Sequence, residues 1–496
     1  MNSIADFLVQ NKPILDAIEK FIDKYIGASL LRKCGLAKIV DKVDPNDVYT
    51  YPDTPLSRLI GNVKESAFLK KCVSARQLLL DKLILCFFMG SAFRMFKTDT
   101  FFGNYKKDTF YRFDLNPSAN WEKLQGETAR NVILDIESQT DDKHARVLIF
   151  DDSLYQRFRG KSTQLCSRVF DHNDMKTRLG YRMMTGGWSN GDVYIPFAQS
   201  LLTTRDKDLM VGPDEKFDRR TLQGKRRELA KTKGTDVVYH MVKYAKRVGI
   251  PFDTILFDTW FSSPAQLVAL KEINADVIAM IKKNSTKYTV ITDVETGTKE
   301  KLDVKEIYSR NRKRRGVSKY LLSISAEVSD KSGKTIEVKL VYARNHSNKK
   351  DWVCFVCTDM SLAEEEILKR YLIRWQTETY FKICKSYLKL RKECHSTCYD
   401  SITAHMVIVS IRYMVLALER FRSTDTRTIE DIFYSVQREV VCQMIDTAII
   451  IVLDALLESV RKCFGASEEQ IDTLVHNFID ELPVVWREKF RDPMAA

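Results

Sequence analysis

The chain has 496 residues, of which 44% are hydrophobic and 29% are charged, the proportions of a globular protein with two to four structural units. Its net charge of +13 favours a polyanionic partner, because clustered Lys and Arg release counterions from phosphates. We find no signal peptide after Met1 and no apolar run long enough to span a bilayer, and the eleven cysteines are scattered. These features exclude a secreted disulfide scaffold and predict a cytoplasmic protein.

The first region, residues 1–125, has the pattern of a mostly helical segment. Residues 78–85 form its clearest apolar stretch, and basic residues recur throughout. We interpret the region as a helical DNA-binding unit. A plain helical cap over the rest of the protein explains the pattern almost equally well.

Residues 126–275 alternate between strand and helix patterns, which indicates an α/β domain. The apolar segment 146–150 is a predicted buried strand that ends in Asp151 and Asp152. A second predicted strand, 254–257, ends in Asp258. Two apolar strands therefore each deliver an acidic residue at the carboxyl end, although Asp at a strand end is commonly structural.

Residues 276–362 again show strand patterns, and we interpret them as a β-rich insertion into the α/β domain. The insertion carries a run of basic residues that includes Arg312, Arg314 and Arg315. This run is a candidate DNA contact. A solvated loop is about as good an explanation.

The most informative segment lies in residues 363–400, which we assign as the second part of the α/β domain. On a helix of about 100° per residue, Tyr371, Arg374, Glu378 and Lys385 fall within an arc of roughly 60°. Lys382 lies on the same stripe. A single carboxylate among cations on one helix face indicates a metal-binding acid held beside a polyanion. After residue 400, the apolar pattern of 401–496 predicts a helical region with a role in dimerisation.

Two aspartates at strand ends and one glutamate on a packed helix supply the hard oxygen ligands that Mg²⁺ prefers. Two such ions can activate a nucleophile and stabilise the leaving oxygen of a phosphodiester. Strand alternation places Asp152 and Asp151 on opposite faces, so the residues alone leave open which of the two is the first ligand.

The spacing Tyr-x2-Arg-x3-Glu-x6-Lys resembles the hallmark of the insertion-sequence-4-type DDE transposases, and Tyr371, Arg374, Glu378 and Lys385 fill its four places. The segments 150–153 and 257–261 resemble the family's two aspartate motifs. The resemblance extends over roughly residues 147–400.

This resemblance implies an RNase H-like catalytic fold interrupted by the β-rich insertion. It further implies that Asp152, Asp258 and Glu378 coordinate two Mg²⁺ ions, for which Mn²⁺ is a substitute. The first ligand, by resemblance, is Asp152.

The resemblance also implies the DNA contacts. Arg374 and Lys385, with Lys382 beside them, would hold phosphates near the transposon end, and Tyr371 would position that end. Some relatives use a Trp of the insertion to stabilise a flipped base, and Trp352 is the candidate here. A core Trp is the equal alternative.

The expected function is a cut-and-paste transposase that acts as a homodimer on double-stranded terminal inverted repeats and target DNA in the bacterial nucleoid. Relatives excise the element by nicking, form a hairpin at its end and integrate through the freed 3′-hydroxyl. The rival hypotheses are a metal-dependent nuclease or resolvase on the same fold, and a domesticated DNA-binding protein without catalysis.

Overall fold

The computed structural model describes residues 13–36, 39–40, 72–88, 90–98, 105–140, 144–171, 174–293, 295, 297–314, 318–345, 348, 350–422 and 427–481. The chain divides into two compact units. The first comprises Met1–Phe21, Lys38–Phe110 and Asp431–Ala496, and the second comprises Ile22–Ala37 and Tyr111–Glu430. The predicted region 1–125 is therefore shared between the two units.

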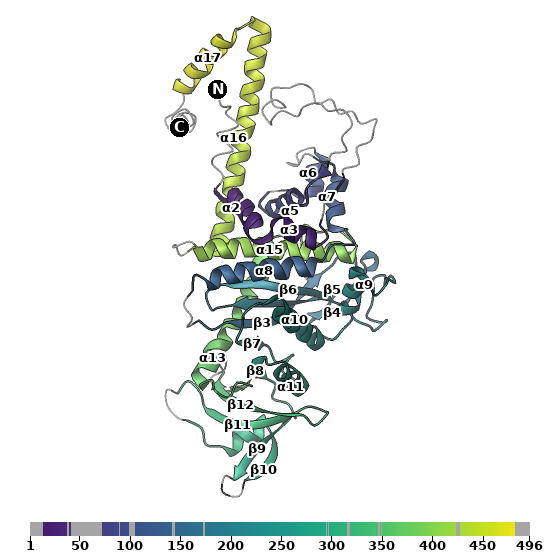
Figure 1. Ribbon diagram of the computed structural model, residues 1–496, viewed down its shortest axis with the longest axis vertical. Helices are drawn as coiled ribbons and strands as arrows, with labels where there is room; N and C mark the ends of the chain where they lie inside the picture. Colours follow the sequence, from purple (N-terminus) through teal and green to yellow (C-terminus); the bar gives the residue numbers. More distant parts are fainter. Residues whose placement is uncertain are drawn as a thin grey trace. The chain divides into compact units, whose positions relative to one another are not determined.

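The second unit is built on an eleven-stranded mixed sheet (Figure 1). Its strands run in the order β10-β9-β11-β12-β13-β8-β7-β3-β5-β4, and β6 also pairs with β5. The strands are β3 (Val147–Gln156), β4 (Ser167–Asp171), β5 (Lys176–Ser189), β6 (Tyr194–Leu202), β7 (Thr254–Phe257), β8 (Asp276–Ile281), β9 (Lys287–Asp293), β10 (Thr298–Asp303), β11 (Leu322–Ser329), β12 (Thr335–Arg344) and β13 (Trp352–Cys357).

The centre of this sheet has the strand arrangement of an RNase H-like domain. The antiparallel strands β6, β5 and β3 are followed by β7 and β8, which run parallel to β3. Strands β3 and β7 carry apolar residues on both faces, and Phe150 and Phe257 are completely buried. Continuous apolar runs of this kind suit central parallel strands with both faces covered. The predicted RNase H-like α/β fold is confirmed.

The boundary of the β-rich insertion differs from the prediction. We placed it at residue 276, but β8 begins there and pairs in parallel with β7. The additional strands β9–β13 follow β8, and β13 pairs antiparallel with β8. The insertion therefore extends the same sheet and forms no separate one, because β8 presents a free edge with which β13 pairs.

Helices cover both faces of the central strands. They are α8 (Trp121–Glu137), α9 (Leu222–Ala230), α10 (Gly234–Val248), α11 (Pro264–Glu272), α12 (Val304–Arg310), α13 (Glu364–Leu372), α14 (Gln376–Ser386) and α15 (Tyr399–Arg422). Helices α8 and α15 lie beside β6 (Figure 1). Helix α15 is long and apolar enough to cross a membrane, yet its most apolar stretch is fully buried, as in the core helix of a folded domain.

The first unit is helical in its described part. It contains α2 (Pro13–Phe21), α5 (Ala75–Ile84), α6 (Ala92–Lys97) and α17 (Glu468–Glu481), together with the small strands β1 (Ile39–Val40) and β2 (Cys72–Val73). Leu78 and Leu79 on α5 are fully buried. Helix α3 (Gly27–Lys33) belongs to the second unit, and helix α7 (Lys107–Asp114) spans the division between the two units. Helix α16 (Ile429–Phe464) begins at the end of the second unit and continues in the first.

Candidate active site

Strands β3 and β7 bring two aspartates to one face of the sheet. Asp151 lies in the middle of β3, which continues past the predicted strand end to Gln156, and Asp258 follows the last residue of β7. In the parallel pairing, Phe150 lies opposite Phe257, so Asp151 and Asp258 are the next residues on the two strands. Residues in register on neighbouring strands point to the same face. Asp151 and Asp258 are therefore adjacent acids on that face.

Asp152, our predicted first acid, lies on the opposite face. Its carboxylate pairs with Arg182 of β5, at 2.9 Å from the guanidinium Nε. Strand alternation predicted that the two aspartates lie on different faces. The pairing with β7 and the position of the following helices favour Asp151 over Asp152 as the first acid.

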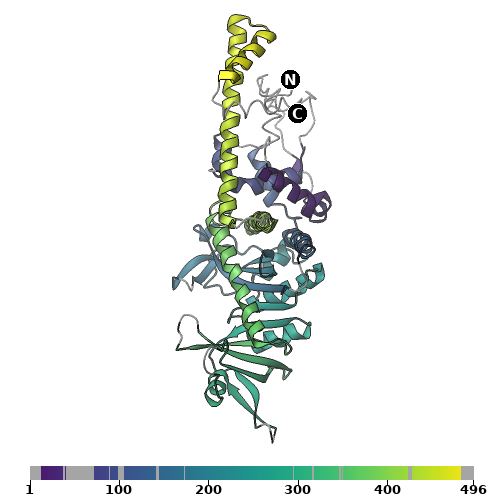
Figure 2. The same cartoon turned by 90° about the vertical axis from the view of Figure 1, so that its left-hand side faces the viewer.

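The glutamate reaches the same region on the helical segment α13–α14. A short 3-10 turn, Ile373–Trp375, joins α13 to α14, so the segment from Tyr371 to Lys385 stays helical as predicted. The first residue of α14, Gln376, accepts from Ser189 Oγ at 2.6 Å and donates to the Gly191 carbonyl at 2.6 Å. These two bonds fix the start of α14 against the β5–β6 turn. The green helical segment in Figure 2 is α13–α14, which packs against strands of the sheet.

Arg374 connects the helix to the first acid. Its side chain is 8% exposed, and Nη1 donates to Asp151 Oδ2 at 2.8 Å. The other terminal nitrogen is 3.7 Å from Glu378 Oε1, and the Glu378 side chain is half exposed. One guanidinium thus reaches two of the carboxylates, and its charge also interacts with Asp258.

The surroundings shift the pKa values of this cluster. Burial raises the pKa of Asp151 to about 7, although Arg374 and the backbone N–H of Asp152 act in the opposite direction. Burial likewise raises the pKa of Tyr371 to about 12. Burial alone would lower the pKa of Arg374, but the hydroxyl and carboxylates around it raise the value above its usual range. Asp151 is therefore a buried acid with too little positive charge around it.

Lys385 contacts the next residue of β3 on the same face. Its ammonium donates to Ser153 Oγ, two positions beyond Asp151. Burial, with Arg391 as the second cause, lowers the pKa of Lys385 to about 8. Arg374 and Lys385 thus hold α14 along the face of β3 that carries Asp151, and Lys382 is exposed.

The donor chemistry suits a hard divalent cation, since Asp151, Asp258 and Glu378 are all carboxylates and all three interact with the charge of Arg374. As the side chains stand, no three acidic, His or Cys residues of the described part are grouped closely enough to hold a metal ion. The guanidinium of Arg374 provides the positive charge between Asp151 and Glu378. The half-exposed Glu378 is the ligand with the most freedom to change its position.

Trp352 lies in an aromatic cluster of the insertion. Its ring stacks on Tyr308 at 4.6 Å and contacts Tyr342 at 5.3 Å between centroids. The Lys283 ammonium is 4.2 Å from the ring centroid. These neighbours match the packed alternative that we considered for this Trp.

The basic run of the insertion is exposed where the structure describes it. Arg312 and Arg314 are both exposed, and the Arg314 guanidinium lies 4.1 Å from the ring centroid of Tyr320. With Lys339 and Glu364 they line an open cavity of about 390 Å³. Arg315 lies outside the described residues.

Sequence reasoning missed an exposed aromatic next to the second acid. Trp260 is 52% exposed, two residues after Asp258, and the Lys282 ammonium lies 3.4 Å from its ring centroid. Both residues follow the ends of parallel strands, β7 and β8, at the edge that holds the acids. The sequence signal for Trp260 that was available is its position two residues after Asp258, the acid at the end of the second predicted strand.

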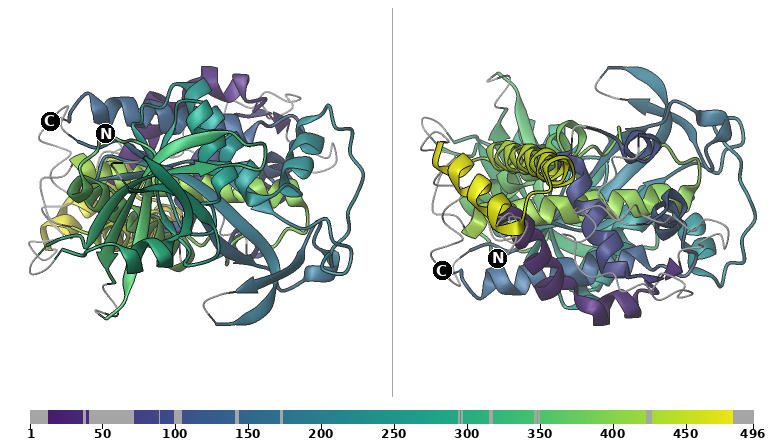
Figure 3. Two further views of the ribbon diagram at one scale, coloured as in Figure 1. Left: turned by 90° about the horizontal axis from the view of Figure 1, so that it is seen from below. Right: turned by 90° about the horizontal axis from the view of Figure 1, so that it is seen from above.

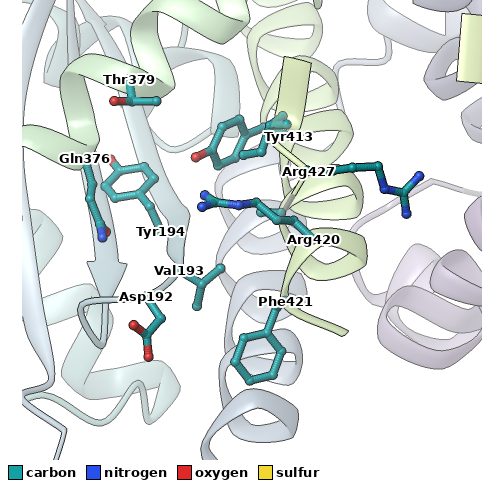
Figure 4. A pocket seen from close by; sticks show the side chains of 11 residues that line it. Asp192, Val193, Tyr194, Gln376, Thr379, Tyr413, Arg420, Phe421 and Arg427 are labelled. Atoms are coloured by element: carbon teal, nitrogen blue, oxygen red, sulfur yellow. The ribbon is translucent and has the colours of Figure 1, made fainter. Parts of the chain in front are cut away.

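A cavity of about 480 Å³ lies on the other side of α14. Gln376 and Thr379 line it, and on a helix these positions point away from Arg374 and Lys385. Figure 4 shows Arg420 reaching toward Tyr413 within it. None of the three acids lines this cavity, so it is separate from the candidate active site.

Comparison with known proteins gives two family matches. Residues 82–314 match a family described as DDE superfamily endonuclease, and residues 228–415 match a family described as Transposase DDE domain. The two matches overlap on the segment that contains Asp258. No curated protein matches the chain.

Proposed function

We propose that this chain, which matches DDE endonuclease and transposase domain families, is a DNA transposase of the insertion-sequence-4 type. It excises an insertion sequence and joins the freed ends to target DNA. The observation that carries the proposal is the convergence of Asp151, Asp258 and Glu378 around Arg374, beside the middle of β3 and the end of β7.

In this proposal Asp151, Asp258 and Glu378 hold two Mg²⁺ ions, with Mn²⁺ as a substitute. Bound ions of this kind stabilise charge on the attacking and departing oxygens of a phosphodiester. Burial raises the pKa of Asp151 to about 7, and a cation bound beside it would favour its ionised form. Its position in the sheet, between β5 and β7, fixes its carboxylate before DNA binds.

The cations of α14 bind the DNA strand in this account. Arg374, whose Nε lacks an acceptor among the described residues, would bind a phosphate beside the carboxylates. Lys385 and the exposed Lys382 extend the positive face toward the next phosphates. Tyr371, packed on Phe355 at 4.7 Å between ring centroids, positions the strand beside Arg374.

The remaining features of the proposal follow the resemblance. The enzyme nicks the transposon end, closes a hairpin there and transfers the 3′-hydroxyl into target DNA. It acts as a homodimer on double-stranded terminal repeats in the nucleoid. Arg312, Arg314 and Arg315 of the insertion contact the flanking duplex.

The test is metal-dependent nicking of supercoiled plasmid DNA by the full chain. We expect Asp258→Asn and Glu378→Gln each to reduce nicking by at least about a hundredfold, while DNA binding is retained, because carboxamides are poor ligands for hard cations. Unchanged nicking in both variants would overturn the site.

A nuclease or resolvase on the same fold is the second candidate, and the match to an endonuclease family favours it. Strand transfer of pre-cleaved ends separates the two. A transposase joins the 3′-hydroxyl to a target plasmid, whereas the nuclease only cuts.

A further inference from the structure

A row of basic side chains continues from the candidate active site onto the loop after β3. Residues 382–392, at the end of α14 and just beyond it, contain five basic residues and no acidic one. Residues 157–161, directly after β3, contain three basic residues and no acidic one. Two neighbouring segments of a single charge sign are the electrostatic signature of a polyanion-binding surface.

Hydrogen bonds hold these two segments side by side. Arg391 Nη2 donates to the Leu154 carbonyl at 3.1 Å, and Arg157 Nη1 donates to the Cys394 carbonyl at 2.8 Å. Together with the bond from Lys385 to Ser153, they align the end of α14 with the outer half of β3. The basic row is therefore continuous in space.

Several members of the row are available for a ligand. Arg159, Lys161 and Lys392 are exposed, and within the described part of the chain their side chains make no ion pair. Phe158 stands among them at 85% exposure. Arg157 and Arg391 differ, because they bond to carbonyl groups and serve to fold the segment.

The distance between the acids and the basic row follows from the length of β3. Strand β3 continues five residues beyond Asp151 to Gln156, which is roughly 16 Å at about 3.3 Å per residue. The ribbon formed by β3, β4 and β5 projects from the sheet in Figure 3. A duplex rises about 3.4 Å per base pair, so this reach corresponds to about five base pairs.

We propose that an exposed strip of residues binds the duplex on one side of the scissile position, within about five base pairs of it. This basic strip consists of Arg159, Lys161 and Lys392, together with the aromatic Phe158 that lies among them. The proposal rests on the proposed function and specifies where its DNA runs. The cations contact phosphates, and Phe158 contacts the sugar or base surface that exposed aromatics favour. The strip gives affinity without reading sequence.

The test compares the double variant R159A/K161A with a matched control, K301A/K331A. Lys301 and Lys331 are exposed residues of the insertion, at β10 and the β11–β12 turn, so both variants lose the same net charge. The affinity of each full chain for a 30-base-pair duplex of arbitrary sequence is measured between about 50 and 200 mM NaCl. We expect the strip variant to bind roughly tenfold more weakly and its logarithmic salt slope to decrease by about two.

The control should keep the wild-type slope. If the two variants behave alike, only net charge is at work and the strip is wrong. Phe158→Ala, a change at an exposed position, supplies a second readout. It should weaken binding about fivefold with no change of slope, since an aromatic ring releases no counterions, and wild-type affinity would contradict its role.

These results are distinguishable from failure of the proposed function. The duplex-binding measurements of R159A/K161A require no cleavage, because the strip contains none of the acids. If D258N and E378Q nick normally, the active site fails while the strip measurements still stand.

Discussion

Two adjacent aspartates in the middle of β3 have different surroundings. Asp151 faces Arg374 and the neighbouring Asp258, whereas Asp152 pairs with Arg182 on the other face. Alternation along a strand predicts that they diverge. Alternation does not say which face of β3 packs against α14, which comes much later in the chain. The choice between Asp151 and Asp152 therefore needed the folded structure.

The first prediction at this scale separates the two aspartates. Asp151→Asn should reduce metal-dependent nicking by at least about a hundredfold, because it removes one ligand of a hard cation. Asp152→Asn should leave it within about threefold, since a partly exposed ion pair contributes little. The measurement is single-turnover nicking of plasmid DNA. The reverse ranking would restore Asp152 to the site.

The second prediction concerns pH. The pKa of Asp151 is raised from 3.8 to about 7 by burial, so the folded state binds the proton more tightly than the unfolded state. Its contribution to stability is complete below the unfolded pKa and is lost as pH rises through the folded pKa.

Without metal, Asp151→Asn should therefore stabilise the protein relative to wild type at about pH 8 but not at about pH 4. The change in relative free energy of unfolding should exceed about 1.4 kcal/mol, the equivalent of one pKa unit. Urea unfolding in a chelating buffer measures it. A relative stability that is independent of pH would show that Asp151 has an ordinary pKa.

At the scale of elements, the helical segment α13–α14 is the part of the site that the sequence predicted best. The stripe of Arg374, Glu378 and Lys385 faces β3 as expected, since Arg374 and Lys385 bond to Asp151 and Ser153. The stripe depends only on helical periodicity, which is local. The parallel pairing of β8, which begins at residue 276, with β7 was not predictable from the sequence, because it is a long-range property.

The bonds of Gln376 give a prediction about helix placement. Gln376→Ala removes the two hydrogen bonds that fix the start of α14, at a cost of about 1–3 kcal/mol in stability. We expect nicking to fall about tenfold because Arg374 and Glu378 lose their fixed position.

Thr379→Ala is the matched control, since Thr379 is an exposed residue of the same helix face. It should leave nicking unchanged. Thermal unfolding of Gln376→Ala shows whether reduced nicking comes from reduced stability or from a displaced α14. If Gln376→Ala nicks at the wild-type rate, the bonds to the β5–β6 turn do not position the site.

At the scale of the whole molecule, the alternation of strand and helix patterns predicted an α/β domain, and the RNase H-like fold was predicted only from the resemblance to the transposase family. The net charge of +13 favoured a polyanionic partner without identifying it. The extension of one sheet to eleven strands was not predictable, since strand patterns do not reveal which edges pair. The DNA-binding role of residues 1–125 and the dimerisation role of 401–496 remain predictions.

The most direct measurement is the location of bound metal. In crystals of the full chain with duplex DNA and Mn²⁺, anomalous scattering should place the metal between the carboxylates of Asp151, Asp258 and Glu378, with Arg374 turned toward a phosphate. Manganese beside Asp152 and Arg182, or DNA bound with Arg374 still on Asp151 and no metal peak near it, would contradict the account.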